Sequence, residues 1–204
     1  MRNDYAGLCG ITEEELEHNF SPEIEVLSQK EGLDRNGTLA ALKQWYDGYL
    51  FAKEGESVYN PFSILSAFKA QDFGSYRFAT GTPTFLVNFL KEARYSIPDL
   101  DGNIQLNEAG LETYWADAQS SLPILFQSGY FTIKKYDAKY RLYSLGFPND
   151  EMRYGFLNNL LPVYTNITEQ ATGFFYCPIY QRYRSGKCRR LYETDAVDYF
   201  LYSV

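Results

Sequence analysis

The string Trp45-Tyr46-Asp47-Gly48-Tyr49 ends a predicted helix that runs from about residue 37 to residue 47. Glycine reaches positive φ at no steric cost, so Gly48 is predicted to cap the helix in the left-handed conformation. Aromatic side chains then pack on both sides of the turn. Asp47 alone in the string has reactive potential, so a structural role is favoured over contact with a nucleotide or partner. The predicted helix has one apolar face at helical spacing, formed by Leu39, Leu42 and Tyr46.

Two helix starts precede this string. Thr12 and Glu15 have the spacing of a capping box, and Ile11 and Leu16 occupy the hydrophobic-staple positions, which predicts a helix over about 13–20. Ser21-Pro22 is a second start, because proline at the first helical position gives up an N–H that has no partner there.

Two further starts follow it, in the strings Tyr59-Asn60-Pro61-Phe62-Ser63 and Thr80-Gly81-Thr82-Pro83. A capping residue before proline predicts helices near 61–71 and 83–94. The free N–H groups at such helix ends can receive an anion, although most are simply capped. The first of these helices is predicted to bury a face formed by Phe62, Leu65 and Phe68.

The second half changes character. A polar linker is predicted over 96–107, followed by helices near 108–118 and 121–128. Alternating apolar residues around a turn at Asp137-Ala138-Lys139 predict a β-hairpin, and Pro148-Asn149 opens another helix. Two helices and a two-stranded wing have the order of a winged-helix-like unit. The predicted fold is mainly α with a small β-hairpin: a helical lid followed by a winged-helix-like unit.

Composition limits the classes of function. The 204 residues are 45% hydrophobic and include 19 Tyr and 15 Phe, enough for a core and for aromatic interfaces. The net charge is −7, and residues 1–175 hold 14 basic against 23 acidic residues. An acidic body repels phosphate, so nucleic acid is not expected to bind this region. Aromatic stacking of sugars remains an alternative.

No motif predicts a metal site or a catalytic group. Cys9, Cys177 and Cys188 form no CxxC pair, which favours reduced thiols and a cytoplasmic location. No membrane span is predicted, since no run of about 18 apolar residues occurs. His18 is expected on the surface. Pro98-Asp99 with Asp137-Ala138-Lys139 spells a nuclease-like PD…DxK pattern, but a loop and a hairpin tip do not supply the adjacent core strands that this chemistry requires.

Six strings in order resemble successive blocks of a bacterial AAA-ATPase-like family that is usually fused to a PD-(D/E)XK nuclease-like domain. The similarity covers about residues 7–175. The strings are Gly10–Leu16, Trp45–Tyr49, Tyr59–Ser63, Thr80–Pro83, Ser128–Ile133 and Pro148–Glu151.

This resemblance implies a Walker A loop, a Walker B strand and a sensor segment N-terminal to the six strings. None is present, and Gly186-Lys187-Cys188 lacks the first glycine and the hydroxyl of a phosphate-binding loop. Met1 therefore resembles an internal methionine of a longer protein. The chain is expected to be non-catalytic, with no cofactor of its own. ATP and Mg²⁺ are expected only for the full-length parent protein.

By the same resemblance, residues 1–107 form a helical lid-like region, and 108–175 form the winged-helix-like unit and its following helix. The tail 176–204 departs from the family and is predicted to be a frameshift product. The expected partners are the missing nucleotide-binding core and the nuclease-like half, with self-association where they are absent. An autonomous protein-interaction module and an aromatic-rich carbohydrate-binding protein are the alternatives.

Overall fold

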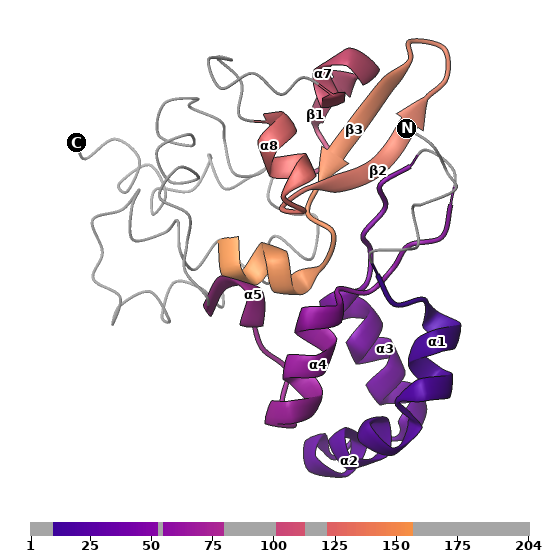
Figure 1. Cartoon of the computed structure of the whole chain (residues 1–204), viewed down its shortest axis with the longest axis vertical. Coiled ribbons are helices and arrows are strands. Elements are labelled where there is room, and N and C mark those ends of the chain that lie inside the picture. Colours follow the sequence, from indigo (N-terminus) through magenta and orange to yellow (C-terminus); the bar gives the residue numbers. More distant parts are fainter. Residues whose placement is uncertain (1–9, 53–54, 80–100, 113–121, 157–204) are drawn as a thin grey trace, which may run out of the picture.

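The computed structural model describes residues 10–52, 55–79, 101–112 and 122–156. Four helices form a helical unit: α1 (Glu13–Asn19), α2 (Ser21–Glu31), α3 (Arg35–Tyr46) and α4 (Pro61–Ala70). The short helix α5 (Tyr76–Ala79) follows them. The sheet unit comprises β1 (Ile104–Asn107), α7 (Glu108–Glu112), α8 (Leu122–Gln127), β2 (Thr132–Asp137), β3 (Leu142–Gly146) and the helical residues 150–156. The described protein is therefore mainly α with one small sheet, and the two units lie at opposite ends of it (Figure 1).

The predicted starts of α1, α2 and α4 are confirmed, whereas the predicted start at Thr82-Pro83 lies outside the described residues. At α1 the Thr12 side chain accepts from Glu15 N, and the Glu15 carboxylate accepts from Thr12 N, so the capping box is complete. At α4 the Asn60 side chain accepts from Ser63 N, and Pro61 is the first helical residue. The helix α3 begins two residues before the predicted start, because the Asp34 carboxylate caps it by accepting from Gly37 N.

The core of the helical unit consists of apolar side chains from all four helices. Leu16, Ile24, Leu27, Leu42 and Ile64 are completely buried. Tyr46 and Tyr59 complete this core from the two ends of the loop that joins α3 to α4.

The predicted buried face of α4 was wrong. Phe62 and Leu65 are 50% and 52% exposed, whereas Ser63, Ile64 and Ala67 are buried. The buried side carries Ile64 and Ala67, which pack in the core of the helical unit, and Ser63, whose hydroxyl donates to the buried Glu151 carboxylate at 2.6 Å. Phe68 does pack against the core, stacked on Phe20.

The sheet has three antiparallel strands in the order β1-β3-β2, so the prediction of a two-stranded hairpin was incomplete. The hairpin of β2 and β3 is confirmed, with its turn at residues 138–141. The prediction that residues up to 107 are only a polar linker was wrong. Residues 104–107 form β1, which pairs with β3 from Ile104 opposite Leu145 to Asn107 opposite Leu142. Their partners lie about 40 residues further along the chain, beyond the reach of local sequence signals.

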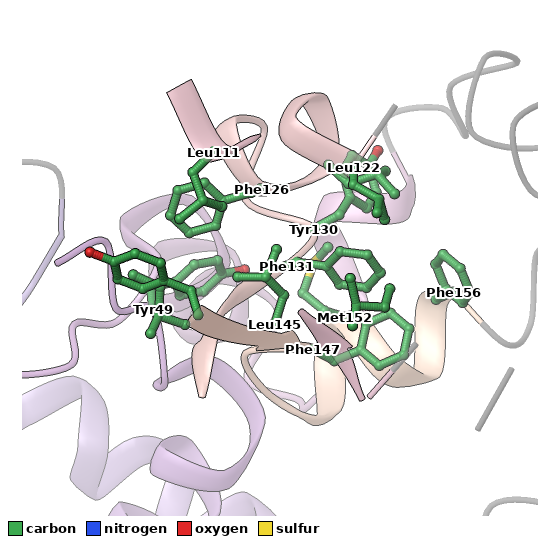
Figure 2. Packing of buried hydrophobic residues seen from close by; sticks show 14 of the residues in the cluster. Tyr49, Leu111, Leu122, Phe126, Tyr130, Phe131, Leu145, Phe147, Met152 and Phe156 are labelled. Carbon is green, nitrogen blue, oxygen red and sulfur yellow. The ribbon is translucent and has the colours of Figure 1, made fainter. Parts of the chain in front are cut away.

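A second core lies between the sheet and the helices α7 and α8 (Figure 2). Phe131, Leu145, Phe147, Met152 and Phe156 are completely buried in it. The aromatic rings of Phe131 and Phe147 meet edge to face, with centroids 5.3 Å apart. Tyr49 and Val58, from the loop between α3 and α4, also belong to this core. The helical unit thus supplies part of the core of the sheet unit.

Several predictions fall outside the described residues: the helix at 83–94, the string Thr80–Pro83, Asp99, the three cysteines and the tail 176–204. Within the ranges that are described, none of the helices combines the length and the apolar composition of a transmembrane span.

Candidate functional site

Five of the six strings meet at the interface between the helical unit and the sheet unit. This interface is called the junction below. The strings Gly10–Leu16 and Tyr59–Ser63 are joined by an antiparallel bridge, in which Ile11 N donates to Tyr59 O and Tyr59 N donates to Ile11 O. A second bridge joins Tyr49 to Val58. Asn60 N donates to Tyr46 O at 3.2 Å, which fixes the start of α4 against the end of α3.

The turn after α3 lies against the segment that opens the last described helix. Gly48 has φ +95°, and a Cβ added there would lie 2.2 Å from the Pro148 carbonyl oxygen. Such an approach excludes any side chain, so glycine is required here both for its backbone conformation and for the close contact. The predicted positive φ of Gly48 is confirmed, but the prediction that Gly48 is the left-handed cap of the helix was wrong, because Asp47 is the C-cap of α3 and has an extended conformation. The need for glycine at position 48 also depends on the contact with Pro148, which lies 100 residues further along the chain and is not part of the local sequence pattern.

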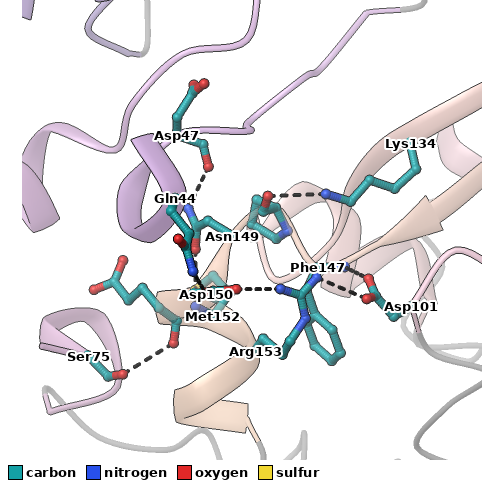
Figure 3. Close-up of polar contacts among 12 residues, drawn as sticks. Gln44, Asp47, Ser75, Asp101, Lys134, Phe147, Asn149, Asp150, Met152 and Arg153 are labelled. Atoms are coloured by element: carbon teal, nitrogen blue, oxygen red, sulfur yellow. Dashed lines mark hydrogen bonds and ion pairs between the residues drawn. The ribbon is translucent and has the colours of Figure 1, made fainter. Parts of the chain in front are cut away.

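Asn149 connects both sides of this contact (Figure 3). Its side-chain amide donates to Asp47 O at 2.8 Å, and its side-chain oxygen accepts from Met152 N at 3.1 Å. The second bond is that of a helix N-cap, so the predicted helix start at Pro148-Asn149 is confirmed. One buried side chain therefore caps a helix and holds the end of another.

Asp150 and Arg153 extend this polar contact in both directions. The Asp150 carboxylate accepts from the Gln44 amide on α3 and from the Arg153 guanidinium, each at 2.5 Å. Arg153 also pairs with Asp101 at 2.9 Å, and Asp101 accepts from Phe147 N. The ion pairs are largely shielded from water, which strengthens them relative to surface pairs. Figure 3 shows this continuous chain of contacts from α3 to the segment before β1.

Glu151 is a fully buried carboxylate on the other side of the same helix. It accepts from the Ser63 hydroxyl at 2.6 Å and from Arg77 N at 3.1 Å, and its backbone oxygen accepts from the Ser75 hydroxyl. Burial raises the pKa of Glu151, while the Ser63 and Arg77 hydrogen bonds partly oppose that rise. The side chain thereby ties α4 and α5 to residues 150–156.

Arg77 links α5 to the string Ser128–Ile133. Its guanidinium donates to Ser128 O, Gly129 O and the Tyr49 hydroxyl. Its Cζ lies 5.9 Å from the ring centroid of Tyr49 and 5.6 Å from that of Tyr130. A small pocket of about 130 Å³ lies beside it, lined in part by Tyr49, Asn60 and Gly129. Because these guanidinium donors are directed at acceptors of the protein itself, Arg77 holds α5 against Tyr49 and the string Ser128–Ile133.

Asp47, the reactive candidate of its string, has a buried carboxylate. One carboxylate oxygen accepts from the Ser57 hydroxyl at 2.9 Å, and the other has no hydrogen-bond partner among the described residues. Tyr46, from the same string as Asp47, and Tyr59, from the string Tyr59–Ser63, are also buried. Loss of hydration raises the pKa of both phenols. These hydroxyls stay neutral at physiological pH, so they offer hydrogen bonds rather than charge.

The other residues considered for chemistry are scattered. His18 is exposed on α1, as predicted. The Asp137 carboxylate accepts from Lys139 N and Tyr140 N and so closes the hairpin turn, as expected of an acid at a hairpin tip. Within the described ranges no three His, Cys, Asp or Glu side chains lie close enough to hold a metal ion.

Sequence reasoning missed the roles of Arg77, Gln44 and Glu151. Glu151 lies in a string that was singled out, but a carboxylate beside a helix start is ordinarily a solvated first-turn acid. Arg77 and Gln44 have no local signal, since their partners lie about 50 and 106 residues away. The sequence offers one indication of a role for Arg77: it is a charged residue in a segment that otherwise consists of aromatic and small residues.

Comparison with known proteins adds one relative. The chain is 38% identical over 152 residues to a protein from Azotobacter chroococcum mcd 1 with the name "Uncharacterized protein in vnfD 5'region". The match covers 73% of this chain and 27% of the relative, so the chain spans about a quarter of that curated protein. No protein-family model and no solved structure matches the chain.

Proposed function

We propose that this chain is the helical lid and winged-helix-like part of an AAA-ATPase-like protein, and that by itself it is not catalytic. Under this proposal the six strings hold the lid on the winged-helix-like unit and do not form a nucleotide site. A movement of the lid would then displace the wing with it.

The observation behind this proposal is that five strings from distant parts of the sequence converge on one junction. Polar atoms of the strings bond to one another there, Asn149 to Asp47 and Ser63 to Glu151, and Arg77 of α5 donates to Ser128 in a fifth string. A protein that used these strings to bind a nucleotide would direct donors toward an open space. Here the side-chain donors are directed at carbonyl and carboxylate oxygens of the protein, which supports a structural coupling role.

The strand order supports the winged-helix part of the proposal. In winged-helix units a short strand precedes two helices and pairs with the second strand of the wing, which gives the order seen for β1-β3-β2. The helices α7 and α8 occupy the corresponding places between β1 and β2. The strand that sequence reasoning missed is therefore the element that adds most to this resemblance.

The partners under this proposal are a nucleotide-binding core and a nuclease-like half supplied by a longer parent protein. The Azotobacter relative extends far beyond the matched region, as such a parent would. Phe62 and Leu65, one turn apart and half exposed on α4, offer an apolar contact for that core. A second copy of the chain is the alternative occupant, and sedimentation over a concentration series would detect it.

Two experiments test the proposal. Calorimetry of the chain with Mg-ATP should show no binding heat and no hydrolysis. Binding at micromolar concentration that is lost when Asn60 is changed to Ala would make the junction a nucleotide site. Sequencing of the coding DNA upstream of Met1 should reveal a GxxxxGK[ST] loop in frame, and a long upstream region without such a loop would overturn the assignment.

A further inference from the structure

Asparagine or aspartate is followed directly by glycine at three places in the chain: Asn36-Gly37, Asp47-Gly48 and Asp101-Gly102. At such a step the backbone nitrogen of the glycine can attack the side-chain carbonyl carbon of the residue before it, because glycine has no Cβ to hinder the approach. The attack closes a succinimide ring. The neutral carboxamide of asparagine reacts in this way more readily than an ionised carboxylate does, so Asn36-Gly37 is the most reactive of the three steps.

Asn36 is an exposed residue in the first turn of α3. The N–H groups of a first turn have no carbonyl partner within the helix. The Gly37 N–H donates instead to the Asp34 carboxylate, at 2.7 Å, and this contact is the N-cap of α3. While the cap is intact, the nitrogen that would attack is engaged in a hydrogen bond, and the helical backbone of Asn36 is fixed. Reaction at Asn36 therefore requires this turn to open.

Opening of the first turn does not disturb the core of the helical unit. Residues 31–34, which precede it, are all exposed. Thr38, which follows it, is completely buried, and its hydroxyl lies 2.8 Å from that of Ser28 on α2. Helix ends fray at a lower free energy than the helix as a whole unfolds. Fraying is therefore expected to free residues 35–37 and to stop at Thr38.

We propose that Asn36 is a site of spontaneous deamidation and that the Asp34 cap sets its rate. In the opened turn the Gly37 nitrogen bonds to the side-chain carbonyl carbon of Asn36. The side-chain amide nitrogen leaves as ammonia, with the proton that the Gly37 nitrogen loses. Water then opens the ring at either of its two carbonyl groups, which leaves aspartate or isoaspartate at position 36. This inference stands on α3 alone and does not require the proposed relationship to an ATPase.

The two products affect α3 differently. Aspartate adds a negative charge to the first turn, where it interacts favourably with the helix dipole. Isoaspartate inserts a methylene group into the backbone, which interrupts the spacing of the helical hydrogen bonds. The modified residue lies at the opposite end of α3 from Trp45 and Tyr46, which belong to the junction. Deamidation is therefore expected to change the start of α3 and to leave the junction intact.

The test is incubation of the full chain at mildly alkaline pH, followed by digestion at acidic pH and mass spectrometry of the peptides. The peptide that contains Asn36 should gain the mass that accompanies exchange of an amide for an acid, faster still in urea. Asp34→Ala should raise the rate in the folded chain about fivefold, the factor that corresponds to the ~1 kcal/mol contributed by a cap. Asp34→Ser keeps a capping oxygen and should leave the rate near that of the unmodified chain.

Two controls separate the cap of α3 from a general loosening of the chain. Thr12→Ala removes the cap of α1 and should leave the rate at Asn36 unchanged. Asn103 is exposed like Asn36, but it precedes Ile104, whose branched side chain hinders the attack. The peptide that contains Asn103 should therefore keep its mass over the same period.

A folded Asp34→Ala chain in which Asn36 reacts no faster than in the unmodified chain would overturn the proposal. A slower reaction would overturn it as well, since the Asp34 carboxylate would then assist the attack as a base. An equal gain of mass at Asn103, or an Asn36 peptide that keeps its mass even in urea, would have the same consequence. If Asp34→Ala does not fold, the unmodified chain decides, because equal rates with and without urea would contradict protection by the helix.

Discussion

The two apolar cores of this protein differ in where along the chain their residues originate. The core of the helical unit uses neighbouring helices and is complete within residues 11–76. The core of the sheet unit combines residues 104–156 with Tyr49 and Val58, from the loop between α3 and α4. The helical unit can therefore form from short-range contacts, whereas the sheet unit depends on how the junction presents that loop.

This difference implies that damage at the junction affects both units, while damage to a local feature affects one. Leu50 illustrates the dependence: its N–H donates to the Thr132 hydroxyl, and its carbonyl oxygen accepts from both Thr132 and Ile133 N. The loop that leaves the Gly48 turn thus runs alongside β2. The predictions below compare junction and local changes in this order of expected effect.

The largest effect is expected for Gly48→Ala. The new Cβ would strain a backbone at φ +95° and collide with the Pro148 carbonyl oxygen, at a cost of about 4 kcal/mol in the free energy of unfolding. The matched control is Gly32→Ala, at φ +67° with nothing within 4 Å, where the backbone term alone costs about 1 kcal/mol. Urea denaturation measures both. Similar losses of unfolding free energy for the two variants would show that the close contact with Pro148 does not add to the cost of a side chain at position 48.

A smaller loss is expected for Asn149→Ala, which removes a helix cap and the hydrogen bond to Asp47 O. The cap and the unsatisfied buried carbonyl together predict a loss of about 2–3 kcal/mol. Asn107→Ala is the control, because Asn107 is exposed and its side chain accepts only from Gly110 N, at the start of α7. It should cost below about 1 kcal/mol. A control loss as large as that of Asn149→Ala would contradict the double role of Asn149.

The buried carboxyl of Glu151 predicts a pH dependence. Its pKa is raised in the folded protein, so the folded state binds its proton more tightly than the unfolded chain does. The resulting stabilisation is complete below the ordinary pKa of 4.5 and is lost as the pH rises through the raised pKa. One such group changes the free energy of unfolding by at most about 1.4 kcal/mol per pH unit.

Glu151→Gln should flatten that part of the stability profile above pH 4.5 relative to the unmodified chain. Glu14→Gln, an exposed change of the same type on α1, corrects for the altered net charge. Urea denaturation at several pH values between 4.5 and 7.5 gives the comparison. Parallel profiles for the unmodified chain and Glu151→Gln would show that this carboxyl does not titrate as its burial implies.

The smallest effect is expected for a purely local change. Thr12→Ala removes the capping box of α1 and should cost about 1 kcal/mol, with the loss confined to the helical unit. Glu14→Ala, one position from the box partner and exposed, should stay within about 0.5 kcal/mol. Circular dichroism during thermal unfolding measures both. A Thr12→Ala loss comparable to that of Gly48→Ala would erase the distinction between local and junction positions.

The same division explains which features the sequence predicted. Caps act within four residues, so Thr12, Asn60 and Asn149 could each be placed correctly from the sequence. The buried face of α4 could not, because one of the contacts on that face joins Ser63 to Glu151, 88 residues away. The strand β1 was missed for the same reason. Its alternation of Ile104, Gln105, Leu106 and Asn107 is visible in the sequence, but four residues without a known partner predict a loop equally well.

The junction was likewise predicted only where its features depend on local contacts. The strings were recognised as distinctive one by one, and their meeting at one junction was not, because the contacts that join the helical unit to the sheet unit, such as Asn149 with Asp47 and Ser63 with Glu151, link residues about 90 to 100 positions apart. Arg77 is the clearest case, since Ser128 and Gly129 are both required to explain its position.

Hydrogen exchange followed by mass spectrometry, on the unmodified chain and on Gly48→Ala, tests most directly whether the junction couples the two units. If it does, Gly48→Ala should accelerate exchange in peptides from α4 and from β2 and β3 to a similar extent, while Thr12→Ala should accelerate exchange in α1 and α2 alone. Faster exchange in Gly48→Ala that is confined to the turn at residues 45–49, or to one unit, would contradict the account.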